Sequence, residues 1–153
     1  MSSRYFEDWT EGEVVETRGA TLTESQIVDF AMLYDPQPMH IDKTFAEAGQ
    51  FEGLIASGFQ TIGVSFRLFY DLGYLTHSNI IGVGLDEVRW TAPVRPGDTL
   101  RCRVEVLALK ESRSKPDRGT MTFKLTTLNQ RGAEVMSFRS TCMLKRRAAA
   151  AGA

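Results

Sequence analysis

An aspartate and a histidine stand five positions apart in a short segment that two prolines stiffen. The segment, residues 35–42, reads DPQPMHID and contains Asp35 and His40. A carboxylate and an imidazole that face one water molecule can act together as general base and general acid. Because proline restricts the unfolded chain, such a loop fixes its side chains at a low cost in entropy. The same residues also allow a structural interpretation, in which Asp35 ends a helix and His40 packs against or caps the next one.

A second candidate lies where residues 53–58, GLIASG, lead into a long apolar segment. The first N–H groups of a helix have no partner inside the helix and carry partial positive charge, so they can polarise a carbonyl oxygen. Gly58 occupies this position, although a glycine here can also serve only to let the helix approach a strand. The other histidine, His77, lies in a polar run and is expected to be solvated.

These candidates must be positioned by elements in the first half of the chain. A short strand is expected around residues 14–15. Thr23 and Gln26, three residues later, form a capping box, which indicates that a helix begins there. Apolar residues recur at helical spacing over residues 27–34. Pro36 ends the helix, because the residue before a proline avoids the α conformation.

Two further helices are expected before the chain changes character. Pro38 is expected to keep the backbone extended, and a short helix is expected over about residues 42–48. Residues 58–72 contain no proline and carry apolar side chains on almost every face. A helix that is apolar nearly all round is a buried one. We therefore expect this helix to lie at the centre of the domain.

From about residue 80 the apolar residues alternate with polar ones, which indicates strands. Strands are expected over about residues 80–90, 100–108, 121–126 and 136–144. We predict that these strands form an antiparallel meander. One buried helix followed by strands, with at least one strand before it, means an α+β domain in which a sheet wraps around the helix. Residues 1–145 are expected to form this single domain, and residues 146–153 a disordered tail.

The composition excludes several classes of protein. The chain has 153 residues, 18 of them basic and 19 acidic, and a formal net charge of −1. This near balance argues against nucleic acid or an anionic membrane as a partner. The two cysteines, Cys102 and Cys142, lie far apart, and with only two histidines no metal site is expected. No apolar run has the length of a signal-peptide core or a membrane span, so we expect a soluble, cytoplasmic protein.

Several segments recur together in one known family. They are residues 35–42, the pair Phe45-Ala46, residues 53–58, and residues 85–98, which read LDEVRWTAPVRPGD. In order and spacing they resemble the MaoC-like dehydratases, the R-specific enoyl-CoA hydratases of hot-dog fold. The resemblance covers roughly residues 21–145. It implies an antiparallel sheet wrapped around one long central helix.

The resemblance also implies an activity and assigns residues to it. The family adds water to a trans-2-enoyl-CoA to give an (R)-3-hydroxyacyl-CoA, or removes water in the reverse direction. Asp35 and His40 fall on the family's catalytic dyad, which holds and activates that water. Gly58 falls where a backbone N–H binds the thioester oxygen. No cofactor is expected except coenzyme A as part of the substrate.

Three more residues are expected to support the site, namely Gln37, Pro38 and Ser57. The family usually has Asn at the position of Gln37 and His at the position of Ser57. These two departures are expected to affect which substrate this chain accepts more than which class of reaction it catalyses. Ser57 removes a bulky side chain beside the oxyanion position, and Gln37 keeps an amide. The resemblance further implies a homodimer in which each active site lies near the interface.

Two other functions compete with hydration. Hot-dog thioesterases mostly place an acid on or beside the central helix, whereas residues 58–70 contain no Asp or Glu. The other alternative is a non-catalytic subunit that binds acyl thioesters. A cone-shaped α+β barrel is the alternative fold, but its helices usually precede the sheet as a longer block. Basic residues for the phosphates of CoA cluster in the second half of the chain, without any one being assigned: Arg89, Arg95, Arg101, Arg103, Lys110, Arg113 and Lys115.

Overall fold

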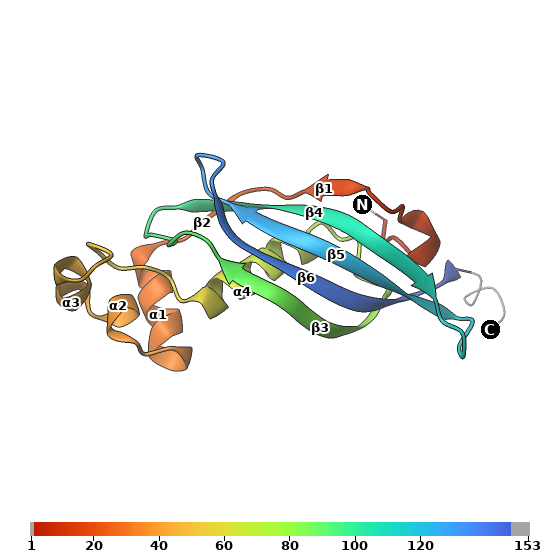
Figure 1. The fold of residues 1–153 in the computed structure, drawn as a ribbon, viewed down its shortest axis with the longest axis horizontal. Helices are drawn as coiled ribbons and strands as arrows, with labels where there is room; N and C mark the ends of the chain where they lie inside the picture. The colour runs from red at the N-terminus through yellow and green to blue at the C-terminus, as the bar shows by residue number, and fades with distance from the viewer. Residues whose placement is uncertain (1, 148–153) are drawn as a thin grey trace.

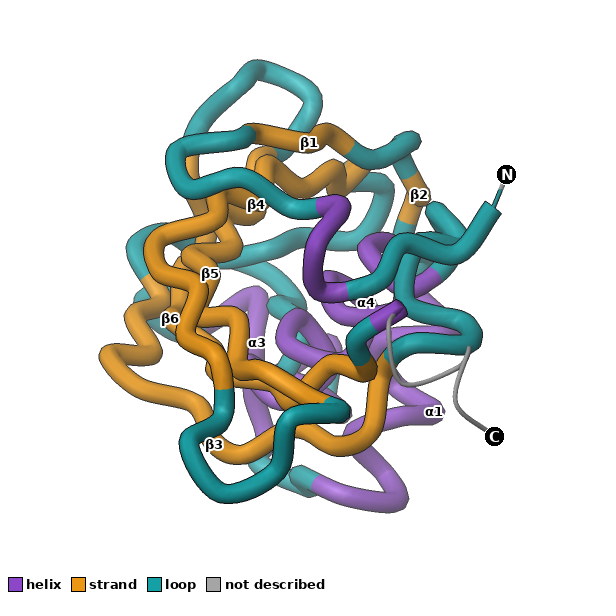
Figure 2. Tube along the Cα trace, turned by 90° about the vertical axis from the view of Figure 1, so that its right-hand side faces the viewer, coloured by secondary structure: helices purple, strands orange, loops and turns teal. Residues whose placement is uncertain are grey.

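The computed structural model describes residues 2–147. An antiparallel sheet curves around one long helix, α4 (Gly58–Tyr70), and three shorter helices gather beyond one end of the sheet (Figure 1). Those helices are α1 (Glu24–Tyr34), α2 (Pro38–Ile41) and α3 (Lys43–Ala48). The view turned by 90° shows the strands curving past α4 (Figure 2). Helices and strands are segregated, so the predicted α+β class is confirmed.

The order of the strands differs in one respect from the predicted meander. The long strands are β3 (Asn79–Trp90), β4 (Thr99–Glu111), β5 (Arg118–Leu128) and β6 (Glu134–Lys145), and the short strands β1 (Val14–Glu16) and β2 (Ala20–Thr21) pair with β4. The order β1-β4-β5-β6-β3 places β3 beside β6 at one edge. The meander is therefore correct for β4 to β6 and wrong for β3, because alternation identifies a strand without identifying its neighbour.

The helix α1 begins and ends as predicted. The Thr23 hydroxyl accepts a hydrogen bond from the Gln26 N–H at 3.2 Å, and the Gln26 side chain accepts one from the Thr23 N–H at 3.0 Å. The predicted extended conformation at Pro38 is wrong, because Pro38 begins α2. Proline suits the first position of a helix, where its fixed φ is helical and no N–H is needed. The predicted short helix is confirmed as α3, with Asp42 as its N-cap.

The central helix α4 is buried on one face only. Phe69 is fully buried against the apolar side chains of the sheet. Phe59, Phe66 and Tyr70 are exposed, so the prediction of a helix buried all round is wrong for the face that they share. The reason is geometric, because a sheet that curves around a helix covers the side that faces it and leaves the opposite side open.

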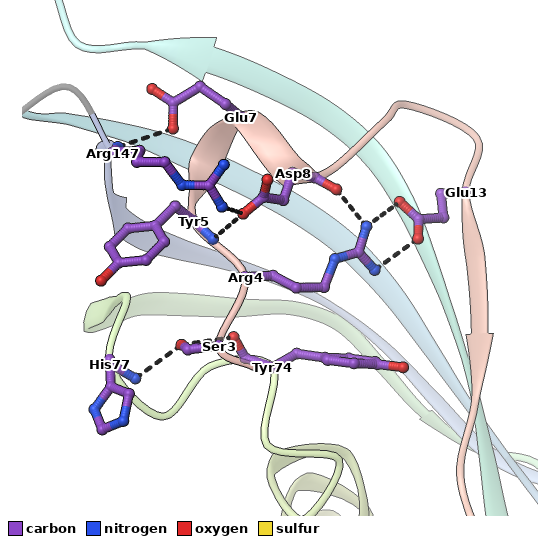
Figure 3. A network of polar contacts seen from close by, with 9 residues as sticks. All are labelled: Ser3, Arg4, Tyr5, Glu7, Asp8, Glu13, Tyr74, His77 and Arg147. Atoms are coloured by element: carbon purple, nitrogen blue, oxygen red, sulfur yellow. Dashed lines mark hydrogen bonds and ion pairs between the residues drawn. The ribbon is translucent and has the colours of Figure 1, made fainter. Parts of the chain in front are cut away.

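Polar contacts fasten the N-terminal segment to the chain that follows α4 (Figure 3). Arg4 donates through its guanidinium to both carboxylate oxygens of Glu13, at 2.7 and 2.8 Å. The same guanidinium lies over the ring of Trp9. Ser3 donates a hydrogen bond of 3.1 Å to the carbonyl of Tyr74. The Ser3 contact holds the start of the chain against Tyr74, which follows α4, whereas the Arg4 contacts lie within the N-terminal segment.

The predicted disordered tail, residues 146–153, is described only at its first two positions. Arg146 pairs with Glu7 at 2.9 Å, and Arg147 pairs with Asp8. These contacts with the N-terminal segment extend the ordered chain two residues beyond the predicted boundary. Residues 148–153 lie outside the described residues, so the rest of that prediction is not tested.

Candidate active site

Asp35 and His40 meet in the interior, beside the N-terminus of α4. Asp35 is the residue at which α1 ends, and His40 lies on α2. Their side chains are buried, with 8% of Asp35 and 5% of His40 exposed. Nε2 of His40 lies 3.4 Å from Oδ2 of Asp35. The end of one helix and the single turn that follows therefore bring the predicted pair together.

A backbone contact determines how His40 presents its ring. Nδ1 of His40 lies 2.7 Å from the carbonyl oxygen of Ile55. A carbonyl can only accept, so Nδ1 carries the hydrogen, and in the neutral ring Nε2 is left with a lone pair. That lone pair and Oδ2 of Asp35 are both acceptors, and their separation is longer than a usual hydrogen bond. The pair is thus suited to hold a water that donates one hydrogen to each.

Both carboxylate oxygens of Asp35 accept hydrogen bonds from the chain. Ser57 Oγ donates to Oδ2 at 2.6 Å, and Gln37 Nε2 donates to Oδ1 at 2.7 Å. The hydrogen bond from Ser57 lowers the pKa of Asp35, and the hydrogen bond from Gln37 lowers it further, while burial acts in the opposite direction. Asp35 is therefore ionised at neutral pH. The two residues that depart from the family pattern are the two that bind its carboxylate.

Ser57 also caps α4. Its hydroxyl accepts a hydrogen bond of 3.2 Å from the N–H of Phe59. Gly58 is the first residue of the helix, so its N–H has no partner inside it. A Cβ atom at Gly58 would collide with the indole of Trp90. This position therefore needs a glycine for close approach, and it also presents a backbone donor beside the pair.

A cavity of about 550 Å³ opens next to these residues. Asp35, Gln37, His40 and Gly58 line it, whereas Ser57 lies buried behind them and Pro38 is exposed at the start of α2. The rest of the wall is largely apolar: Phe51, Ile55, Ala56, Phe59, Thr61, Trp90, Thr91, Ala92, Pro93 and Val94. An apolar cavity with a few convergent polar groups is the usual form of a small-molecule site.

The sequence reasoning missed the wall formed by residues 90–94. These residues belong to the segment on which the family resemblance rests, but nothing local indicated that they face the pair. His77 lines a different depression, near Tyr5 and Lys145, and takes no part in the cavity.

Within residues 2–147, no three His, Cys, Asp or Glu side chains gather where they could hold a metal ion. No helix of that same stretch has the length and apolar character needed to span a bilayer. Cys102 and Cys142 are free thiols, and burial raises the pKa of both.

Comparisons with known proteins identify relatives over most of the chain. The model of the MaoC like domain matches residues 7–129. An uncharacterized protein of Bacillus subtilis (strain 168), YdeM, is 34% identical over 140 residues, which are 92% of this chain and 98% of that protein. The protein named (R)-specific enoyl-CoA hydratase of Rhodospirillum rubrum is 30% identical over 148 residues, which are 94% of this chain and 93% of that protein.

Solved structures agree with these relatives. The crystal structure of the MaoC-like dehydratase from Rhodospirillum rubrum matches with a TM-score of 0.86 at 36% identity, and the match covers 94% of this chain and 97% of that one. A Mycobacterium tuberculosis protein described as a double hotdog fold matches with a TM-score of 0.82 at 21% identity, over 94% of this chain and 44% of that one. The predicted hot-dog fold is confirmed. The chain belongs to the MaoC-like domain family.

Proposed function

We propose that this chain is a hydratase that adds water to a trans-2-enoyl-CoA and forms an (R)-3-hydroxyacyl-CoA, or catalyses the reverse dehydration. The observation that carries the proposal is the buried contact of Asp35 with His40 at the wall of a cavity that also receives the first residue of α4. Similarity to a relative named (R)-specific enoyl-CoA hydratase supports this choice of reaction. The substrate brings its own coenzyme A, and the reaction as written uses no other cofactor.

The pair activates the water. A water between His40 Nε2 and the Asp35 carboxylate donates one hydrogen to each, which leaves an oxygen lone pair directed at C3 of the enoyl group. As that oxygen bonds to C3, His40 takes the proton, because a carboxylate whose pKa lies below its ordinary value is a poor proton acceptor. The electron pair of the double bond moves into the enolate of the thioester. His40 then returns the proton to C2, and one water has been added without any redox change.

The enolate places negative charge on the thioester oxygen. The N–H of Gly58 meets that oxygen and stabilises the charge, helped by the positive end of α4. One such donor is worth about 2.7–4 kcal/mol in the transition state. A positioned acid–base group contributes about 10²–10⁴-fold. Neither contribution is sufficient alone, so the reaction depends on the distance between the pair and the helix N-terminus.

A thioesterase is the alternative that most resembles this chemistry. It directs water at the carbonyl carbon rather than at C3, and an acid on the central helix is the group expected to do so. The helix α4 has no Asp or Glu, and Asp35 lies before α2 and is bound by Ser57 and Gln37. This arrangement favours hydration. Loss of enoyl absorbance without free thiol identifies a hydratase, whereas binding with neither change identifies a non-catalytic subunit.

The direct test is the hydration of crotonyl-CoA by the purified chain. We expect enoyl absorbance to disappear and an (R)-specific 3-hydroxyacyl-CoA dehydrogenase to oxidise the product. Asp35→Asn and His40→Ala are each expected to lower kcat by about 10²–10⁴-fold. His77→Ala, which changes the exposed histidine outside the cavity, is the matched control and retains activity. Full activity in either of the first two variants overturns the assignment of the pair.

We also propose that the chain forms a homodimer through β3. This strand lies at one edge of the sheet and exposes the apolar side chains of Ile81, Val83 and Leu85. Phe66 and Tyr70 of α4 are exposed as well. An edge strand with exposed apolar side chains can pair with a strand of another chain. In a symmetric dimer each copy would bury its own β3 against β3 of the other copy. Sedimentation as a monomer at working concentration contradicts this proposal.

A further inference from the structure

The strand β3 contains an extra residue immediately before the cavity. Asp86 lies opposite Arg139 of β6 and Arg89 lies opposite Ser137, so three steps along β3 match two along β6. The additional residue makes a β-bulge, which bends a strand and redirects the side chains that follow it. Glu87 within the bulge has a φ of 51°, a conformation that residues other than glycine rarely adopt. Such local strain is a reason to look for a function nearby.

The side chain that follows the bulge and enters the cavity wall is Trp90. Its indole lies so close to Gly58 that a Cβ atom there would have no room. The ring of Phe59 stands edge-on to the indole, with the centroids 6.3 Å apart. Trp90 nevertheless remains 52% exposed, and it lines the cavity together with Asp35 and His40. A large aromatic side chain thus stands directly against Gly58, the residue whose N–H is assigned to the thioester oxygen.

We propose that Trp90 determines which acyl groups the enzyme accepts, by closing the space beside the thioester carbonyl; this rests on the function proposed above. A carbonyl oxygen bound at Gly58 N–H lies next to the indole, and C2 is bonded to the carbonyl carbon. A methyl group on C2 therefore competes with the indole for the same space. The substrates that this arrangement selects are enoyl-CoA esters with no substituent on C2. The bulge at Glu87 bends β3 so that the Trp90 side chain occupies that space.

The test compares crotonyl-CoA with its 2-methyl analogue. The wild-type chain is expected to favour crotonyl-CoA in kcat/KM by tenfold or more, since about 10–200-fold is typical for one methyl group in an apolar pocket. Trp90→Ala is expected to remove most of that preference, and Trp90→Phe to keep part of it. Phe45→Ala is the matched control, because this aromatic side chain is equally exposed and lies outside the cavity. An unchanged preference in Trp90→Ala, with an unchanged melting temperature, overturns the proposal.

The bulge is tested separately. Deletion of Glu87 removes the additional residue and leaves Arg89 opposite Ser137 in a regular ladder, so the strand loses the bend that directs Trp90 towards Gly58. We expect this deletion to abolish the preference as Trp90→Ala does. Glu87→Gly keeps the residue count and tolerates positive φ, so it is expected to keep the preference. If the deletion variant retains the wild-type preference, the bulge does not aim Trp90.

A binding measurement separates this proposal from the proposed reaction. The chain has two tryptophans, Trp9 and Trp90, so Trp9→Phe leaves a fluorophore in the cavity wall only. Saturated butyryl-CoA and isobutyryl-CoA cannot be hydrated, and they differ in branching at C2. We expect butyryl-CoA to quench this fluorescence at a concentration at least tenfold lower than isobutyryl-CoA. If butyryl-CoA binds more tightly but no enoyl-CoA is hydrated, the proposed reaction is wrong and the proposed role of Trp90 stands. If enoyl-CoA is hydrated but both esters quench equally, the proposed role of Trp90 is wrong and the reaction stands. If Trp9→Phe fails to fold, the fluorescence quenching is measured in the wild type and in Trp90→Phe. The difference between the two is the contribution of Trp90.

Discussion

The hydroxyl of Ser57 donates a hydrogen bond of 2.6 Å to Oδ2 of Asp35. The same hydroxyl accepts a hydrogen bond from the second N–H of α4, at Phe59. One buried side chain thus connects the carboxylate to which the proposed mechanism assigns the water with the helix end to which it assigns the thioester oxygen. Ser57 therefore links the position of Asp35 directly to that of the N-terminus of α4.

Replacement of Ser57 by alanine therefore has two expected effects. The helix loses its N-cap, which costs about 1 kcal/mol of stability. Asp35 also loses its shortest hydrogen bond to a side chain, so kcat for hydration is expected to fall more than this loss of stability explains. Steady-state kinetics with urea unfolding on the same variant measures both effects.

Thr23→Ala is the matched control, since Thr23 caps α1 in the same way and does not contact Asp35. It is expected to lose a similar stability and to keep its kcat. Equal losses of activity in the two variants would mean that Ser57 acts only through the stability of the fold.

The stability of the chain is expected to depend on the ionisation of Asp35. The hydrogen bond from Ser57, with that from Gln37, lowers the pKa of Asp35 below its ordinary value of 3.8. A lowered pKa means that the folded state favours the carboxylate, so this stabilisation is present above that ordinary value and is lost as the pH falls through the lower value of the folded state. The gap in urea midpoint between the wild type and Ser57→Ala should therefore narrow between neutral pH and about pH 2. A constant gap over this range contradicts the link between Ser57 and Asp35.

Gly58→Ala is expected to destabilise the fold by about 1–3 kcal/mol, because the new methyl group overlaps the indole of Trp90. The same change in a Trp90→Ala background should cost much less, since the space is then free. Thermal unfolding of the two single variants and the double variant gives the coupling energy between these positions. A coupling near zero would show that the glycine is required for the helix start alone.

Val83→Lys places a charge in the middle of the exposed face of β3, where Val83 is 61% exposed. If two copies pair along this strand, the buried charge is unpaired, and we expect the variant to sediment as a monomer. Met32→Lys is the matched control, because Met32 is equally exposed but lies on α1. A wild-type dimer that survives Val83→Lys would place the interface elsewhere.

Features that depend on neighbouring residues were predictable from the sequence. The capping box of Thr23 and Gln26, the end of α1 before Pro36 and the alternation along β4 to β6 arise from contacts within a few residues, so the local pattern contains them. The pairing of β3 with β6 was not predictable in this way. The partner of a strand depends on how distant parts of the chain pack together, and the residue pattern within the strand does not specify it.

The sequence by itself determined which residue types were available for chemistry, namely Asp35 and His40 in a stiff segment and a glycine at the start of a long helix. Only the tertiary structure decided that Ser57 reaches Asp35 across 22 positions of the chain and that His40 meets the carbonyl of Ile55 across 15. It likewise placed Trp90 against Gly58. The reason is that contacts between distant segments depend on how whole helices and strands pack together. The spacing of residues within one segment does not predict which distant segment it will contact.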